Sequence, residues 1–191
     1  MARTPSTMLD LGTEAPDFRL PEPATGRTVA RSEFEGNPLL VAFICNHCPF
    51  VLHILDVFAV FAQEYQQRGL QVVAINANDV EKYADDSPDR MIDLARRTGF
   101  GFPYLYDESQ AVARAYRAAC TPDFFLFDAD HRLVYRGRFD GATPGNDEPV
   151  TGMDLRAACD ALLEGTEMPQ DQRPSMGCNI KWKPGNEPEY A

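Results

Sequence analysis

The stretch Leu39-Leu40-Val41-Ala42-Phe43-Ile44, followed directly by Cys45-Asn46-His47-Cys48-Pro49, decides the fold of this chain. Six apolar residues in a row are typical of a strand that is covered on both faces of its sheet. Pro49 suits the first turn of a helix, where its missing N–H costs no hydrogen bond. A helical pattern then continues to about residue 68. The sequence therefore predicts a strand, a Cys-x-x-Cys pair and a helix, in that order.

The Cys-x-x-Cys pair has the placement that a dithiol–disulfide centre needs. One helical turn brings the two sulfurs close enough to bond, and the first sulfur faces free backbone N–H groups at the positive end of the helix dipole. Such surroundings lower a cysteine pKa from about 8.5 to between about 3.5 and 7.5. We therefore predict redox chemistry at Cys45 and Cys48, in preference to two core cysteines or a metal pair.

Apolar runs and helical patterns alternate along the rest of the chain, which is typical of an α/β fold. Strands 38–44 and 70–76 should be parallel because a helix separates them. The turn at 128–131 should make its flanking strands antiparallel. We expect a central mixed sheet flanked by helices, preceded by an N-terminal β-hairpin over 15–29. The further strands are expected at 102–106, 123–127 and 132–139, and the helices at 49–68, 88–98, 109–119 and 154–163.

The length of 191 residues fits one domain whose hydrophobic core is large enough to be stable without disulfides or a metal ion. We expect a loose leader over 1–14, the α/β domain over 15–164 and an extended tail over 165–191. Within the tail, Cys178, Ile180 and Trp182 alternate with polar residues. This pattern predicts a strand-like segment that lays one apolar face on the domain.

The composition limits the partners and the compartment. A net charge of −11 and a pI near 4.6 argue against nucleic acid and against an anionic membrane surface. The N-terminal stretch lacks the apolar core of a signal peptide, and the apolar runs are too short to span a membrane. Five cysteines, an odd number, do not suit a secreted disulfide framework. We expect a cytoplasmic protein with reduced thiols.

The order of strand, Cys-x-x-Cys, helix and strand, followed by Thr121-Pro122 before a hairpin, resembles the thioredoxin fold. The opening at 12–18 and the long segment at 78–119 are similar to the peroxiredoxin and membrane-tethered thioredoxin branch. The chain more narrowly resembles bacterial peroxiredoxin-like proteins, which are AhpC/TSA-type redoxins of the thioredoxin family. The motifs that carry this resemblance are Cys45-Asn46-His47-Cys48-Pro49-Phe50, Asn78-Asp79, Asp86-Ser87-Pro88, Thr121-Pro122-Asp123-Phe124-Phe125 and Gly177-Cys178-Asn179-Ile180-Lys181-Trp182-Lys183.

The resemblance implies a role for each matching residue. Cys45 matches the exposed nucleophilic cysteine, and Cys48 matches the more buried cysteine that resolves the mixed disulfide. Pro122 matches the cis proline that faces the dithiol, and Thr121 would present its backbone to an extended substrate. The implied partners are a disulfide-containing protein or small thiol substrate and a cellular thiol reductant. No cofactor is expected.

The chain also departs from both parent patterns. Thioredoxin has Trp before its first cysteine and Gly-Pro between the two, where this chain has Ile44 and Asn46-His47. The strand before Cys45 carries no acidic residue to match the buried carboxylate of thioredoxin. Peroxiredoxins need Thr or Ser three residues before the peroxidatic cysteine, and Ala42 stands there. This last departure weighs against a peroxidase.

Other side chains could take part in the chemistry. His47, as an imidazolium, would stabilise a thiolate and make the protein more oxidising, or it is a plain surface histidine. Cys120 is an auxiliary thiol or, more simply, a small core residue. The tail either brings Cys178 near Cys45 or covers an edge strand. Cys159 is expected in the core.

A zinc site is the less favoured reading of the first two cysteines. Cys45, Cys48, His47 and His53 would supply four ligands, but no second Cys-x-x-Cys or His pair completes a usual spacing. We therefore expect no metal.

The function favoured by the sequence is an enzyme, a thiol–disulfide oxidoreductase that uses Cys45 and Cys48. One alternative is a thiol peroxidase with antioxidant activity, in which Cys45 forms a sulfenic acid that Cys48 resolves. Another alternative is a redox-sensing or binding protein without turnover. A homodimer stays open, because the helix over 49–68 has a wide apolar face.

Overall fold

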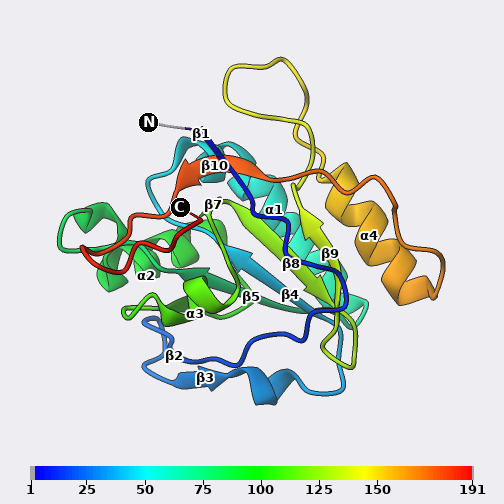
Figure 1. Ribbon diagram of the computed structural model, residues 1–191, viewed down its shortest axis with the longest axis horizontal. Helices are drawn as coiled ribbons and strands as arrows, with labels where there is room; N and C mark the ends of the chain where they lie inside the picture. Colours follow the sequence, from blue (N-terminus) through cyan, green and yellow to red (C-terminus); the bar gives the residue numbers. More distant parts are fainter. Residues whose placement is uncertain (1–2, 191) are drawn as a thin grey trace.

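The apolar run before Cys45 forms β4 (Leu39–Phe43), the central strand of a five-stranded sheet in this computed structural model, which describes residues 3–190 (Figure 1). All five residues of β4 are buried, as their apolar run predicts. The sheet has the order β6-β5-β4-β8-β9. Its other strands are β5 (Gln71–Asn76), β6 (Tyr104–Tyr106), β8 (Asp123–Phe127) and β9 (Leu133–Gly137).

The sheet is mixed, which confirms the expected architecture. β4, β5 and β6 run parallel, while β8 is antiparallel to both β4 and β9. The connection between β4 and β5 is the long helix α1 (Pro49–Gln67), as a parallel pair requires. The remaining helices are α2 (Pro88–Thr98), α3 (Ala111–Ala115) and α4 (Met153–Glu164).

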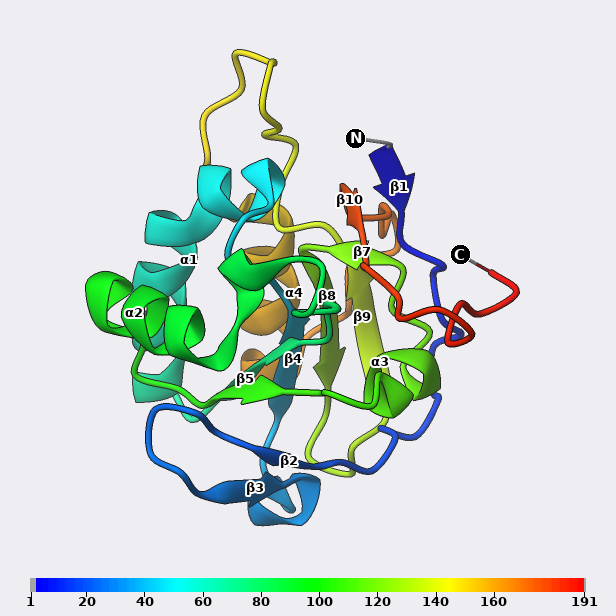
Figure 2. The same cartoon turned by 90° about the vertical axis from the view of Figure 1, so that its left-hand side faces the viewer.

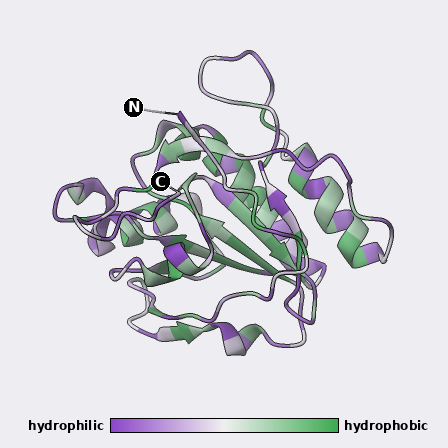
Figure 3. Cartoon of the chain, viewed as in Figure 1, coloured by the Kyte–Doolittle hydropathy of each residue, from purple (hydrophilic) through white to green (hydrophobic). Residues whose placement is uncertain are grey.

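Two apolar layers cover the two faces of the sheet (Figures 2 and 3). Leu40 and Ala42 point into the layer that contains α1, α2 and α4. Leu39, Val41 and Phe43 point into the other layer, which contains α3, the N-terminal hairpin and part of the tail. The alternation along β4 follows from the two-residue period of a strand. The hairpin predicted from the sequence consists of β2 (Arg19–Pro21) and β3 (Thr28–Ala30).

A second small sheet joins the two ends of the chain. β1 (Arg3–Pro5), β10 (Met176–Asn179) and β7 (Cys120–Thr121) pair antiparallel in the order β1-β10-β7. The expectation of a loose leader is therefore corrected for residues 3–5, which pair with the tail. Residues 1 and 2 lie outside the described part of the chain.

Several elements differ from their expected bounds, and two of these differences have a clear cause in the backbone. The strand expected at 178–182 is β10 at 176–179. The Ile180 N–H still donates to the Ala119 carbonyl, but the chain then turns, and the Trp182 N–H donates to the Ile180 carbonyl. The helix expected at 109–119 is the shorter α3, since Arg117 takes a left-handed conformation (φ 52°) and turns the chain toward β7. Among the described residues, no helix is both long and apolar enough to cross a membrane.

Candidate active site

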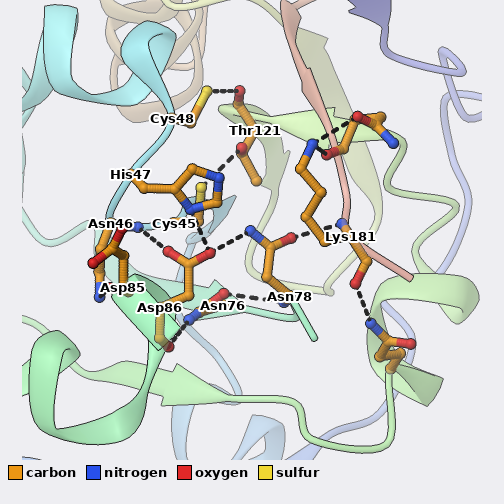
Figure 4. A network of polar contacts seen from close by, with 12 residues as sticks. Cys45, Asn46, His47, Cys48, Asn76, Asn78, Asp85, Asp86, Thr121 and Lys181 are labelled. Atoms are coloured by element: carbon orange, nitrogen blue, oxygen red, sulfur yellow. Dashed lines mark hydrogen bonds and ion pairs between the residues drawn. The ribbon is translucent and has the colours of Figure 1, made fainter. Parts of the chain in front are cut away.

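Both cysteines of the Cys-x-x-Cys pair lie at the junction between β4 and α1. Cys48 is the N-cap residue of α1, and Cys45 lies in the short loop before it. Their exposed fractions are 1% for Cys45 and 0% for Cys48, so the exposed position expected for Cys45 is wrong in this conformation. The His47 ring lies beside Cys45 in Figure 4 and retains an exposed side-chain fraction of 20%.

Thr121, at the end of β7, contacts the sulfur atoms of both cysteines. The hydroxyl oxygen of Thr121 lies 3.3 Å from Cys45 Sγ, and the carbonyl oxygen of Thr121 accepts a 3.1 Å hydrogen bond from the Cys48 thiol. The peptide bond between Thr121 and Pro122 is cis, as the family resemblance implies. The structure therefore brings the dithiol and the Thr121-Pro122 motif together.

The surroundings of the sulfurs favour a thiolate on Cys48. Hydrogen bonding from Cys45 lowers the pKa of the Cys48 thiol to about 5, and the Cys178 thiol and the backbone N–H groups of Val51 and Cys178 act in the same direction. The Val51 N–H belongs to the first turn of α1, where N–H groups have no helical partner. The sequence pattern predicts this stabilisation at Cys45 instead.

The pKa of the Cys45 thiol is shifted in the opposite direction. The hydrogen bond to Cys48, burial and the negative charge of Asp86 hold the pKa of Cys45 well above its usual range. Since one hydrogen bond links the two sulfurs, the pair shares its protons and loses the first from the Cys48 side.

A buried carboxylate organises the loop between the cysteines (Figure 4). Asp86 is 0% exposed and belongs to the short 3-10 helix η2 (Ala84–Asp86). Its two oxygens accept three hydrogen bonds of 2.7 Å, from the Asn46 backbone N–H, His47 Nδ1 and Asn78 Nδ2. The His47 ring also stacks on Tyr83 at a centroid distance of 5.6 Å. These contacts fix the His47 ring beside Cys45.

Asp86 and Asn78 have no site role predicted from the sequence. Asp86 lies 39 residues after His47 in a stretch that looks like a solvated polar loop, so no local pattern reveals their contact. Asn76 Nδ2 also bonds the Asp86 carbonyl, and Asn78 Oδ1 accepts the Lys181 N–H, which links the loop to the tail. A site carboxylate is thus present, although it does not come from the strand before Cys45.

A metal ion fits this cluster poorly. Cys45, His47 and Asp86 offer ligand atoms that lie within 4.8 Å of one another. However, His47 Nδ1 lies 2.7 Å from the Asp86 carboxylate and donates to it directly, which leaves no space for an ion between them. His53, the fourth member of the set considered from the sequence, is exposed and lies outside this cluster.

Of the three remaining cysteines, Cys178 contacts the dithiol, Cys120 contacts a backbone carbonyl and Cys159 lies in the core. The tail brings Cys178 to Cys48, rather than to Cys45, and the Cys178 thiol hydrogen-bonds the Cys48 sulfur. Cys120 is buried, and its thiol donates to the Pro122 carbonyl at 3.6 Å. Cys159 is buried in α4, as expected.

The tail occupies the strand edge at which the resemblance places a substrate. Cys178 pairs with Thr121, and Asn179 pairs with Cys120. The expectation that Thr121 presents a free backbone is therefore corrected for this conformation. Pro122 also lines a cavity of about 280 Å³, together with Phe50, Phe139 and Met176. Neither Cys45 nor Cys48 lines this cavity.

Known proteins share this fold. A crystal structure of an uncharacterized conserved protein from Geobacillus kaustophilus is 49% identical and has a TM-score of 0.95, covering 97% of this chain and 98% of that one. A thiol:disulfide interchange protein of the thioredoxin family from Chlorobium tepidum TLS has a TM-score of 0.62 over 80% of this chain and 97% of that one. Its identity of 16% means that this likeness concerns the fold alone.

Sequence comparison gives a relative of named activity. The thiol-disulfide oxidoreductase ResA of Halalkalibacterium halodurans is 27% identical over 123 residues, or 64% of this chain. The matched part spans 65% of that relative's length. Residues 11–136, well over half of the chain, match the AhpC/TSA family. The chain therefore has a thioredoxin-like fold and belongs to the AhpC/TSA family.

Proposed function

We propose that this protein is a thiol–disulfide oxidoreductase whose reactive pair is Cys45 and Cys48. The observation that supports this most is that Thr121 contacts both sulfurs, at 3.3 Å and 3.1 Å, while the two sulfurs hydrogen-bond each other at the start of α1, beside the cis Pro122. Two thiols in this contact can form a disulfide with little movement of the backbone. The relative named thiol-disulfide oxidoreductase agrees with the proposal.

The hydrogen bond also suggests how a thiolate forms on Cys45. The Cys45 proton passes to the Cys48 thiolate, and the Cys45 sulfur then attacks one sulfur of a substrate disulfide. The other substrate sulfur leaves as a thiolate and takes up the proton that Cys48 releases. Cys48 then attacks Cys45, which forms the Cys45–Cys48 disulfide and frees the second substrate sulfur as a thiolate, which takes a proton from the solvent. A cellular thiol reductant returns the protein to the dithiol.

The substrate reaches Cys45 only after the site opens. The His47 ring lies beside the Cys45 sulfur, and Asp86 holds this ring in place. The cavity beside Pro122 can hold a small part of a substrate, although neither cysteine lines it. We propose a disulfide-containing protein or a small thiol compound as the substrate.

Equilibration with glutathione redox buffers tests the proposal. Wild-type protein should show a two-electron couple between about −270 mV, as in thioredoxin, and about −120 mV, as in the strong oxidant DsbA. Cys48→Ser should lose this couple, whereas Cys159→Ser should retain it, because Cys159 lies in the core of α4. A wild-type protein without a reversible couple would refute the proposal.

A thiol peroxidase is the second candidate, and one contact favours it. Peroxiredoxins use a hydroxyl group near the peroxidatic sulfur, and the Thr121 hydroxyl lies 3.3 Å from Cys45 Sγ although residue 42 is Ala. Hydrogen peroxide consumption with dithiothreitol as the reductant tests this role. Rapid insulin disulfide reduction without peroxide turnover supports the oxidoreductase, and inertness in both assays favours a redox-sensing protein.

A further inference from the structure

Three thiols, rather than two, meet at the start of α1. The Cys48 sulfur accepts hydrogen bonds from the Cys45 thiol and from the Cys178 thiol. Cys178 comes from the tail, 130 positions after Cys48 in the chain. The three side chains belong to one buried apolar cluster, with exposed fractions of 2% or less. Cys48 is therefore in contact with two candidate disulfide partners.

The backbone fixes Cys178 at this point. β10 lies between β1 and β7, so Cys178 is paired with Arg3 on one side and with Thr121 on the other. The preceding residue, Gly177, approaches β7 so closely that a Cβ atom there would lie 2.0 Å from the Thr121 carbonyl oxygen. The same carbonyl accepts the hydrogen bond from Cys48. A single carbonyl thus contacts both the helix start and the tail strand.

We propose that Cys178 is a third redox-active thiol, which exchanges with the Cys45–Cys48 disulfide to form a Cys48–Cys178 disulfide. This exchange step rests on the proposed function of the Cys45–Cys48 pair. The Cys178 thiolate attacks Cys48 Sγ, the bond between Cys48 and Cys45 breaks, and its electron pair leaves on Cys45. Cys45 takes up the proton that Cys178 lost. The number of disulfides stays at one, so no external oxidant or reductant is consumed.

The electrostatics of the cluster change in the direction that this step needs. Burial, the hydrogen bond to Cys48 and the charge of Cys48 together raise the pKa of Cys178 to about 12. Formation of the Cys45–Cys48 disulfide removes the negative charge from Cys48, so two of these effects disappear. The Lys181 ammonium lowers the pKa of Cys178 and remains in place. Oxidation of the first pair therefore makes Cys178 easier to deprotonate.

The exchange would have a structural result. A Cys48–Cys178 disulfide joins α1 to β10 covalently, and it returns Cys45 to the thiol form beside Thr121. The tail strand would then be locked on the edge of β7, where the resemblance places an extended substrate. The oxidation state of the protein would thus control access to this edge.

The full-length Cys45→Ser variant provides the decisive test. After incubation with oxidised glutathione, it should lose the two thiols of Cys48 and Cys178, and tandem mass spectrometry of a non-reducing digest should find these residues linked. Cys45→Ser/Cys120→Ser should retain this linkage, because Cys120 bonds the Pro122 carbonyl instead. Cys45→Ser/Cys178→Ser should lose it. A linkage absent from Cys45→Ser, or one that joins Cys48 to Cys120, would overturn the proposal.

The wild-type protein gives a second measurement that needs no substitution. After oxidation by one equivalent of oxidised glutathione and alkylation, a fraction of chains should carry alkylated Cys45 together with the Cys48–Cys178 linkage. Absence of this fraction, with Cys45–Cys48 as the sole disulfide, would refute the exchange and leave the proposed function intact. Absence of Cys45–Cys48, with the Cys48–Cys178 linkage present in Cys45→Ser, would refute the proposed function and retain Cys178 as a redox thiol.

Discussion

Replacement of Asp86 by Asn should destabilise the protein strongly, because it disturbs a fully buried acceptor. The carboxylate accepts hydrogen bonds from the Asn46 backbone, His47 and Asn78. An amide keeps one oxygen, which can still accept from Asn46 N–H. Its NH₂ group, however, would face the two donors His47 Nδ1 and Asn78 Nδ2. Two hydrogen bonds to a charged group, at about 1.5 to 3 kcal/mol each, give an expected loss on the order of 3 to 6 kcal/mol.

Urea unfolding of the reduced protein, followed by circular dichroism, measures this loss. Asp85→Asn is the matched control, since Asp85 is exposed and contributes its backbone carbonyl, rather than its carboxylate, to Asn46. We expect the control to change the free energy of unfolding by less than about 0.5 kcal/mol, as is usual for surface substitutions. A loss of less than about 1 kcal/mol for Asp86→Asn would mean that its hydrogen bonds do not hold the loop as described.

Three further predictions concern the thiols, the tail and the core. The ultraviolet absorbance of the thiolate should rise as the pH increases through about 5, and Cys48→Ser should abolish this step, leaving deprotonation at higher pH. Gly177→Ala should lower stability by about 1 to 3 kcal/mol through overpacking, and it should speed alkylation of the tail thiol, measured by mass spectrometry. Gly101→Ala should do neither, because its Cβ would make only an ordinary contact, 3.6 Å from Gln66 Oε1. Phe58→Ala should cost about 3 to 5 kcal/mol in urea unfolding, because its ring packs against four other buried Phe rings, and the exposed Val60→Ala should cost far less.

The local part of the site could be predicted from the sequence. The apolar run of β4 and the following Pro49 determine a strand and a helix start by themselves, because strand period and helix capping act over a few residues. The meeting of the dithiol with Thr121-Pro122 came from the family resemblance. The strand and the helix start depend on short-range backbone geometry, and the contact with Thr121-Pro122 depends on a fold that many sequences adopt.

Contacts between segments that are distant in the sequence determine the burial of Asp86, the tail strand that covers the site, and the cysteine that carries the thiolate. Asp86 is a solvated loop residue by every local rule, yet η2 buries it against the helix start. The tail strand covers the edge of β7 and delivers Cys178 to Cys48. Hydrogen bonds from Cys45 and, to a smaller extent, from Cys178 lower the pKa of Cys48, which makes the second cysteine the favoured thiolate. The sequence by itself determined that two cysteines stand at a helix start after a buried strand. Only the tertiary structure decided which sulfur carries the charge and which third thiol contacts it, because pKa values and strand pairing depend on neighbours that the chain order does not reveal.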